Sequence, residues 1–112
     1  MKKILVATAL IAFSATYAVA GDLVKEGEKI FNTKKIGNCL ACHAANGKKV
    51  NGPGSLGPKL QGLSAWPEKA LYDKVYNPYA TNPISAMPAF GKNGVLSDHQ
   101  IKAVVAYLKT IK

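Results

Sequence analysis

The stretch Cys39-Leu40-Ala41-Cys42-His43 decides how the rest of this sequence is interpreted. Two cysteines separated by two residues and followed directly by a histidine form the attachment motif of c-type haem. The spacing suits that chemistry, because two thiols on one turn can each form a thioether with one vinyl group of a haem. His43 is then held against the iron and supplies a neutral imidazole ligand. The motif therefore predicts one covalently attached haem c, bound by Cys39, Cys42 and His43.

Three other interpretations of the cysteine pair are open. A thioredoxin-like redox pair is expected in a βαβ setting, and no strand pattern surrounds this motif. A zinc site would need two more ligands, and residues 21–112 offer only His43 and His99, which are far from zinc-finger spacing. A disulfide would close a very small loop and would stabilise the fold little. We therefore expect haem attachment.

Residues 1–20 have the plan of a secretory signal peptide. Lys2 and Lys3 make a basic start, residues 4–15 are mostly apolar, and Ala18-Val19-Ala20 is a small-residue cleavage site before Gly21. An uncleaved membrane anchor is the alternative, but the apolar run is shorter than the roughly 20 residues that a span needs. We expect cleavage, and therefore no stable membrane anchor.

The length of residues 21–112 predicts a single domain, and its composition is strongly basic. The full chain has 15 lysines, no arginine and six acidic residues, for a net charge of +9. A small basic protein could bind nucleic acid. The absence of arginine argues against base-specific contacts, and export argues against them more strongly. We expect no nucleic-acid binding, and favour an acidic protein partner or a solvated lysine surface.

Three segments show a helical apolar period: residues 22–33, residues 67–76, and residues 98 to the end of the chain. Gly27 falls on the apolar face of the first segment, where a second helix could approach closely. Ser97 and Gln100 have the spacing of a capping box for the last segment. His99 is expected to be solvated in the first turn and to be a poor iron ligand. Trp66, just before the second segment, is expected in the core.

Two long irregular segments, residues 44–63 and 79–96, lie between these helices. Loops of such length are unusual in a compact domain, unless they fold over a cofactor. An axial histidine needs an acceptor for its second ring nitrogen, and the Pro58 carbonyl is the candidate, with Leu60 packing on the haem ring. An ordinary Gly-Pro turn is the alternative for Pro58.

Met87 is the only methionine that remains once residues 1–20 are removed. It is therefore the only thioether that could bind iron, and Pro83 and Pro88 stiffen the loop around it. The alternative is a methionine that fills a gap in the core. The upstream haem motif favours iron ligation.

Five motifs together resemble the class I cytochrome c family. They are Gly27-x-x-x-Phe31, Cys39-x-x-Cys42-His43, Gly57-Pro58-x-Leu60, Met87-Pro88 and Val104-Val105-Ala106-Tyr107-Leu108. The resemblance implies an all-α class I cytochrome c fold, a single domain wrapped around one covalently bound haem. It also implies that His43 and Met87 bind opposite faces of the iron, and that the terminal helices cross near Gly27 and Tyr107.

A narrower set of motifs is similar to the SoxX family, the small subunits of periplasmic SoxAX cytochromes in thiosulfate oxidation. The set comprises Gly37-Asn38-Cys39-Leu40-Ala41-Cys42-His43, Asn82-Pro83-x-x-x-Met87-Pro88-x-Phe90-Gly91, Leu96-x-x-x-Gln100-Ile101 and Val104-Val105-Ala106-Tyr107-Leu108. The resemblance implies a periplasmic protein with a larger haem-bearing SoxA-like partner subunit. Through that complex it implies contact with a sulfur-carrier protein.

In that family, the larger subunit couples thiosulfate sulfur to a cysteine of the carrier, in an L-cysteine S-thiosulfotransferase reaction. This chain has no thiol left once both cysteines hold haem, so by itself it is expected only to transfer electrons. We expect it to accept electrons from its partner and to pass them to a soluble acceptor. A free periplasmic electron shuttle is the alternative. A haem-based ligand sensor would need an open iron site, which Met87 argues against.

Overall fold

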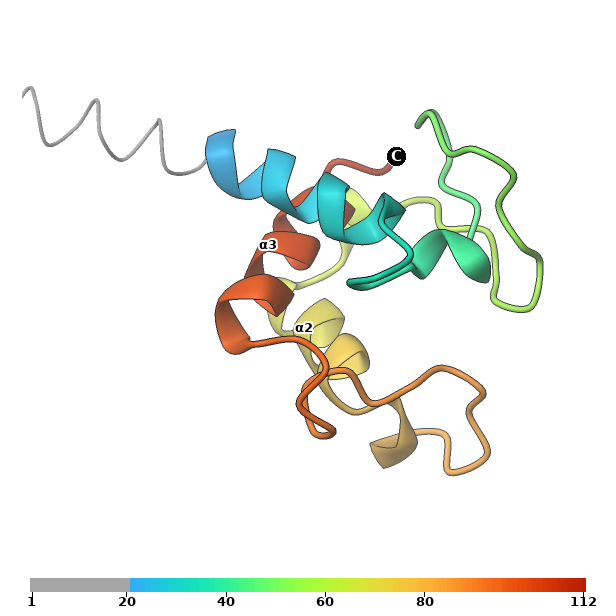
Figure 1. Cartoon of the computed structure of the whole chain (residues 1–112), viewed down its shortest axis with the longest axis vertical. Coiled ribbons are helices and arrows are strands. Elements are labelled where there is room, and N and C mark those ends of the chain that lie inside the picture. Colours follow the sequence, from blue (N-terminus) through green and yellow to red (C-terminus); the bar gives the residue numbers. More distant parts are fainter. Residues whose placement is uncertain (1–20) are drawn as a thin grey trace, which may run out of the picture.

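The computed structural model describes residues 21–112, which are helical and contain no β-strand (Figure 1). The chain is helical over residues 21–32, followed by η1 (Cys39–Ala41), η2 (Leu63–Ala65), α2 (Glu68–Tyr76), η3 (Pro78–Ala80) and α3 (Asp98–Leu108). The predicted all-α class is confirmed for these residues. The predicted signal peptide lies outside the described residues and stays a prediction.

The N-terminal helix, residues 21–32, crosses α3 at a glycine. A Cβ atom on Gly27 would lie 1.9 Å from the Ala103 carbonyl oxygen, so any larger residue would push the two helices apart. Next to this crossing, the rings of Phe31 and Tyr107 pack with centroids 5.3 Å apart. The predicted crossing near Gly27 and Tyr107 is therefore confirmed.

The start of α3 agrees with the prediction from the sequence, but its end does not. The Ser97 hydroxyl accepts from the Gln100 N–H, while the Gln100 side chain accepts from the Ser97 N–H, as the predicted capping box requires. The prediction that this helix runs to the end of the chain is wrong, because it ends at Leu108. The last residues turn away, and the Ile111 carbonyl accepts a hydrogen bond from the Ser64 N–H.

The second predicted helix is present as α2, one residue shorter than expected. Pro67 occupies the N-cap with an extended ψ of 141° rather than the first helical position. Leu71 and Val75 are buried on the face of α2 that meets α3. This face anchors α2 in the core and leaves its other face exposed.

Trp66 is not a core residue, contrary to the prediction, because 46% of its surface is exposed. It immediately precedes α2 and lines a cavity of about 480 Å³ over the exposed side of that helix, together with Ala70 and Asp73. Trp66 therefore lies over the outer side of α2 and not between helices.

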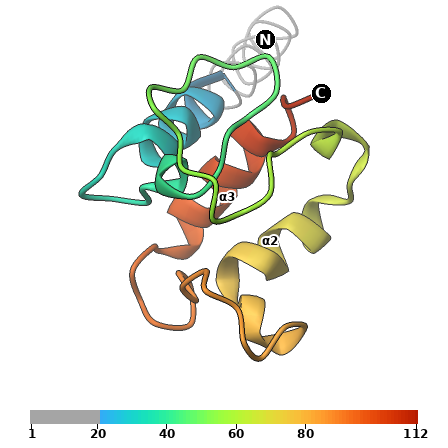
Figure 2. The ribbon, with the colours of Figure 1, turned by 90° about the vertical axis from the view of Figure 1, so that its right-hand side faces the viewer.

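The two long loops lie on the same side of the helices. Figures 1 and 2 show residues 44–62 at the upper end of that side and residues 77–97 at the lower end. The buried core behind them is formed chiefly by the N-terminal helix, α2 and α3. Within residues 21–112, every helix is too short or too polar to traverse a lipid bilayer.

Candidate functional site

The Cys39–His43 stretch forms a tight turn that follows a residue in a left-handed conformation. Asn38 has φ 53°, which asparagine tolerates better than most residues. The next residues form η1, and the Cys39 carbonyl accepts hydrogen bonds from the N–H groups of Cys42 (3.2 Å) and His43 (3.0 Å). The local backbone therefore gathers both cysteines and the histidine within one turn.

Cys39 and Cys42 are free, half-buried thiols. Burial raises the pKa of the Cys39 thiol to about 11, so this group is protonated at neutral pH. The Cys39 side chain packs against the hydrophobic core. The disulfide interpretation is therefore not the arrangement in this structure.

The His43 side chain has one ring nitrogen already occupied. Its Nδ1 lies 2.7 Å from the Pro58 carbonyl oxygen. A carbonyl oxygen can only accept, so Nδ1 carries a proton and donates, and in the neutral ring the lone pair then lies on Nε2. This is the arrangement that orients a histidine for metal binding through Nε2. The hydrogen bond expected from the sequence is present.

Two glycines bring the following loop directly against this turn. A Cβ on Gly57 would lie 2.4 Å from Cε1 of the His43 ring, and a Cβ on Gly54 would lie 1.7 Å from the Ala41 carbonyl oxygen. The Gly57 N–H also donates to the Cys42 carbonyl at 2.9 Å. The loop can therefore hold the imidazole only because these positions lack side chains.

Leu60 continues this contact beyond the proline. Its N–H donates to the Ala44 carbonyl and its own carbonyl accepts from the Asn46 N–H, each at 2.8 Å. Ala45 and Leu60 form an isolated parallel β-bridge. Leu60 is half-buried and packs against the core cluster. The loop after the motif is therefore held near its start and near its end, where these two segments pair.

Met87 reaches the same core from the other loop. It is half-buried and packs against the hydrophobic cluster that Cys39 and Leu60 also border. Its backbone N–H donates to the Ser85 hydroxyl oxygen at 3.1 Å. Ala89 and Phe90, which follow it, are buried. The two loops that carry the predicted site residues therefore converge on one core.

His99 lies in the first turn of α3 and is solvent-exposed, as the sequence predicted. Its side chain is 67% exposed, and its Nε2 lies 2.9 Å from a carboxylate oxygen of Glu26. No cluster of three or more His, Cys, Asp or Glu side chains that could hold a metal occurs among residues 21–112. The zinc interpretation therefore has no ligand set in the part of the chain that the structure describes.

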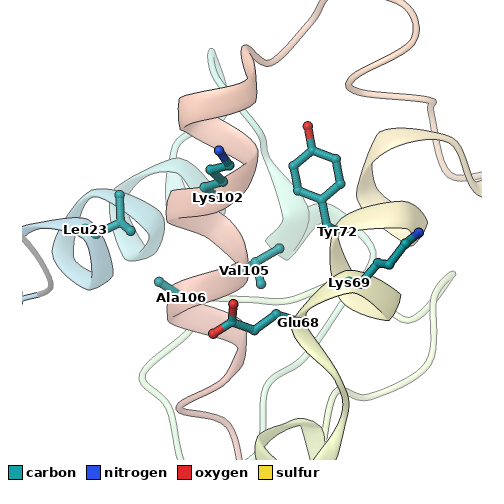
Figure 3. Close-up of a pocket in the computed structure, with 7 residues that line it drawn as sticks. All are labelled: Leu23, Glu68, Lys69, Tyr72, Lys102, Val105 and Ala106. Atoms are coloured by element: carbon teal, nitrogen blue, oxygen red, sulfur yellow. The ribbon is translucent and has the colours of Figure 1, made fainter.

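A groove of about 370 Å³ lies between the N-terminal helix, α2 and α3, and contains none of the predicted site residues. Figure 3 shows Leu23 on the N-terminal helix, Lys102, Val105 and Ala106 on α3, and Tyr72 on α2. All the residues that line this groove lie on helices, and none lies on the two long loops.

Sequence reasoning missed two residues that shape the site. Gly54 lies against the motif backbone, and Ser85 contacts the backbone of Met87. A serine two residues before a candidate ligand is a pattern that could have indicated the second contact, because hydroxyl groups often bond nearby backbone groups. Nothing local marks the first, since Gly54 is one of several glycines in its loop.

Comparison with known proteins gives consistent matches over most of the chain. Residues 22–108 match the family model Cytochrome_CBB3, described as cytochrome C oxidase, cbb3-type, subunit III. Cytochrome c6 of Leptolyngbya boryana is 40% identical over 82 residues, which cover 73% of this chain and 85% of that protein. An uncharacterized lipoprotein of Aquifex aeolicus (strain VF5) is 36% identical over 91 residues, or 77% of this chain. The chain spans only 44% of that lipoprotein.

Among solved structures, a chain of the SoxXA crystal structure from P. pantotrophus is similar with a TM-score of 0.68. The two chains are 34% identical, and the match covers 78% of this chain and 80% of the other.

Proposed function

The chain belongs to the cytochrome c family whose model matches residues 22–108, and from that premise we propose that it is a monohaem electron-transfer subunit of a SoxXA-type complex. Its all-α fold is the class I cytochrome c fold, and it resembles SoxX. The family and its similarity to cytochrome c6 imply haem c as the cofactor. The number of haems, their ligands and the complex are parts of the proposal.

The observation that carries the haem site is the hydrogen bond from His43 Nδ1 to the Pro58 carbonyl. It leaves Nε2 as the free lone pair of a histidine that directly follows two free thiols on one turn. Gly57 leaves no room for a side chain against the imidazole, so the ring is fixed on that side as well. This donor set fits a covalently attached haem.

We assign a role to each predicted site residue on this basis. The sulfur atoms of Cys39 and Cys42 would attach the haem, and His43 Nε2 and the Met87 thioether would bind its iron. Pro58 orients the imidazole, and Leu60 packs beside the haem. When bound, the haem supplies a one-electron couple, and methionine ligation raises its reduction potential.

The chain's own residues favour electron transfer over sulfur chemistry. Both cysteines are committed to haem in this proposal, and the sequence contains no other cysteine to carry sulfur. We therefore propose that the larger SoxA-like subunit performs the thiosulfate chemistry. This chain accepts its electrons in the periplasm and passes them to a soluble acceptor.

The observation that carries the complex is the structural likeness to a SoxXA chain at 34% identity over most of both chains. The test is purification from the native periplasm at moderate salt, followed by an intact native mass and a haem stain of the components. Association with a larger haem protein and thiosulfate-dependent reduction of this chain are expected. A lone monohaem species would contradict the complex and would favour a free electron shuttle.

A further inference from the structure

Met87 is held by a side chain rather than by regular secondary structure. Its backbone N–H donates to the Ser85 hydroxyl oxygen at 3.1 Å, and Ser85 is itself half-buried. The Ser85 N–H donates in turn to the Asn82 carbonyl at 3.0 Å. A short series of contacts therefore runs from the turn at Asn82 through Ser85 to the backbone of Met87.

The chain after Met87 is anchored in a different way. Ala89 and Phe90 are buried, and the N–H groups of Gly91 (3.2 Å) and Lys92 (3.0 Å) donate to the Tyr76 carbonyl at the end of α2. This side of the loop is thus attached to the core by both packing and hydrogen bonds.

The chain before Met87 lacks such packing. Ile84 is 92% exposed and Ala86 is exposed, so neither fixes the loop through burial. Pro88, directly after Met87, has no N–H to contribute. On this side the Ser85 hydroxyl is the contact through which the Met87 backbone is held.

We propose that Ser85 is a positioning residue that holds the Met87 thioether ready to bind the haem iron. This inference rests on the proposed role of Met87. A methionine side chain is unbranched with three rotatable bonds, so a free loop would leave it many conformations. Fixing its backbone in advance lowers the entropy that ligation must remove, which is the general advantage of preorganisation.

The experiment compares holoprotein variants at position 85 by two measurements. The first is the near-infrared charge-transfer band that reports a methionine on ferric haem, with Met87→Ala as the variant that lacks it. The second is a titration with imidazole, which competes with the thioether for the iron. A single hydrogen bond of typical net strength corresponds to about a fivefold change in an equilibrium constant. We therefore expect Ser85→Ala to bind imidazole about fivefold more tightly than wild type.

Matched variants separate the hydroxyl from other effects. Ser85→Thr keeps the acceptor and should behave as wild type, whereas Ser85→Val has the shape of threonine without the hydroxyl and should behave as Ser85→Ala. The Thr and Val pair also decides the matter if Ser85→Ala does not yield holoprotein. Ser64→Ala is the control, because Ser64 is exposed and its contacts run through backbone atoms.

The outcomes distinguish this inference from the proposal beneath it. A wild-type protein without the band would overturn Met87 ligation, and the role of Ser85 with it. A wild-type band together with equal imidazole affinity in wild type, Ser85→Ala and Ser85→Val would overturn the role of Ser85 alone. Equal affinities of the Thr and Val variants would do the same, since only one of them retains the hydroxyl.

Discussion

At the scale of single residues, the site depends on Gly57 as much as on the groups that would bind haem. A Cβ at this position would lie 2.4 Å from the His43 ring, so Gly57→Ala must displace the imidazole or the loop. We expect a destabilisation of about 1–3 kcal/mol, typical of overpacking, and a changed haem spectrum because the bond to Pro58 is disturbed. Thermal unfolding and the ferric absorption spectrum measure the two effects.

Gly52→Ala is the matched control for this prediction. Gly52 lies in the same loop at φ +57°, with nothing within 4 Å of the position its Cβ would occupy. The alanine there strains the backbone and costs stability without touching His43. Both variants should therefore unfold more easily, but only Gly57→Ala should alter the spectrum. An unaltered spectrum in Gly57→Ala would show that the contact with the imidazole does not matter.

Some residues of the site could be predicted from the sequence, and others could not. Cys39, Cys42 and His43 were identifiable because thioether formation requires a fixed spacing, and Pro58 because an axial histidine needs an acceptor. The contact of Ser85 with the Met87 backbone depends on how a loop folds in space. No periodic pattern records such a contact. The position of a serine two residues before a candidate ligand could have indicated it, but the structure was needed to establish it.

At the scale of elements, the apolar period gave the three helices and their buried faces, because each must cover the same core. The end of α3 was predicted wrongly, since it depends on a hydrogen bond from Ser64, which is distant in sequence. The exposure of Trp66 was missed for a related reason. A local pattern cannot state which side of α2 the residue before that helix will cover.

Also at this scale, a hydrogen bond from Tyr72 on α2 to Asp98 on α3 joins the two helices at 2.6 Å. The bond raises the pKa of Tyr72 to about 12 and, together with Lys102, lowers the pKa of the Asp98 carboxyl. Because the folded pKa of Tyr72 exceeds its ordinary value of 10.0, its contribution to stability is lost as pH rises from about 10 to about 12. The contribution of Asp98 is lost instead as pH falls through its lowered pKa.

We therefore expect Tyr72→Phe to be less stable than wild type at pH 7 and nearly equal to it at pH values near 12, where wild type has lost the bond. Asp98 is exposed and Tyr72 is only partly buried, so the difference at pH 7 is expected to be small. Urea unfolding midpoints at several pH values measure it. Tyr76→Phe is the control for general alkaline effects, since it removes a partly exposed phenol that makes no such bond in the structure described. A pH-independent difference between wild type and Tyr72→Phe would contradict the linkage.

At the scale of the whole molecule, the acidic residues lie on the helices, and the segment that contains the haem motif has none. All six acidic residues lie in the N-terminal helix, α2 or α3, whereas residues 29–67 contain six lysines and no acidic residue. The segment around Cys39 to His43 is therefore uniformly positive. A negatively charged redox partner should be attracted to that region, and the attraction should weaken as salt screens it.

Charge reversal at one site in each region tests this distribution. Lys34→Glu, in the turn just before the motif, and Lys25→Glu, on the N-terminal helix, change the net charge equally, and both lysines are exposed. The rate of reduction of hexacyanoferrate(III) by the ferrous protein should fall more in Lys34→Glu at low salt, because its charge lies in the uniformly positive segment. The two rates should converge near 1 M salt, where the Debye length is about 3 Å. Equal rates at low salt would mean that only the net charge acts, and that the lysines around the motif do not direct the partner to it.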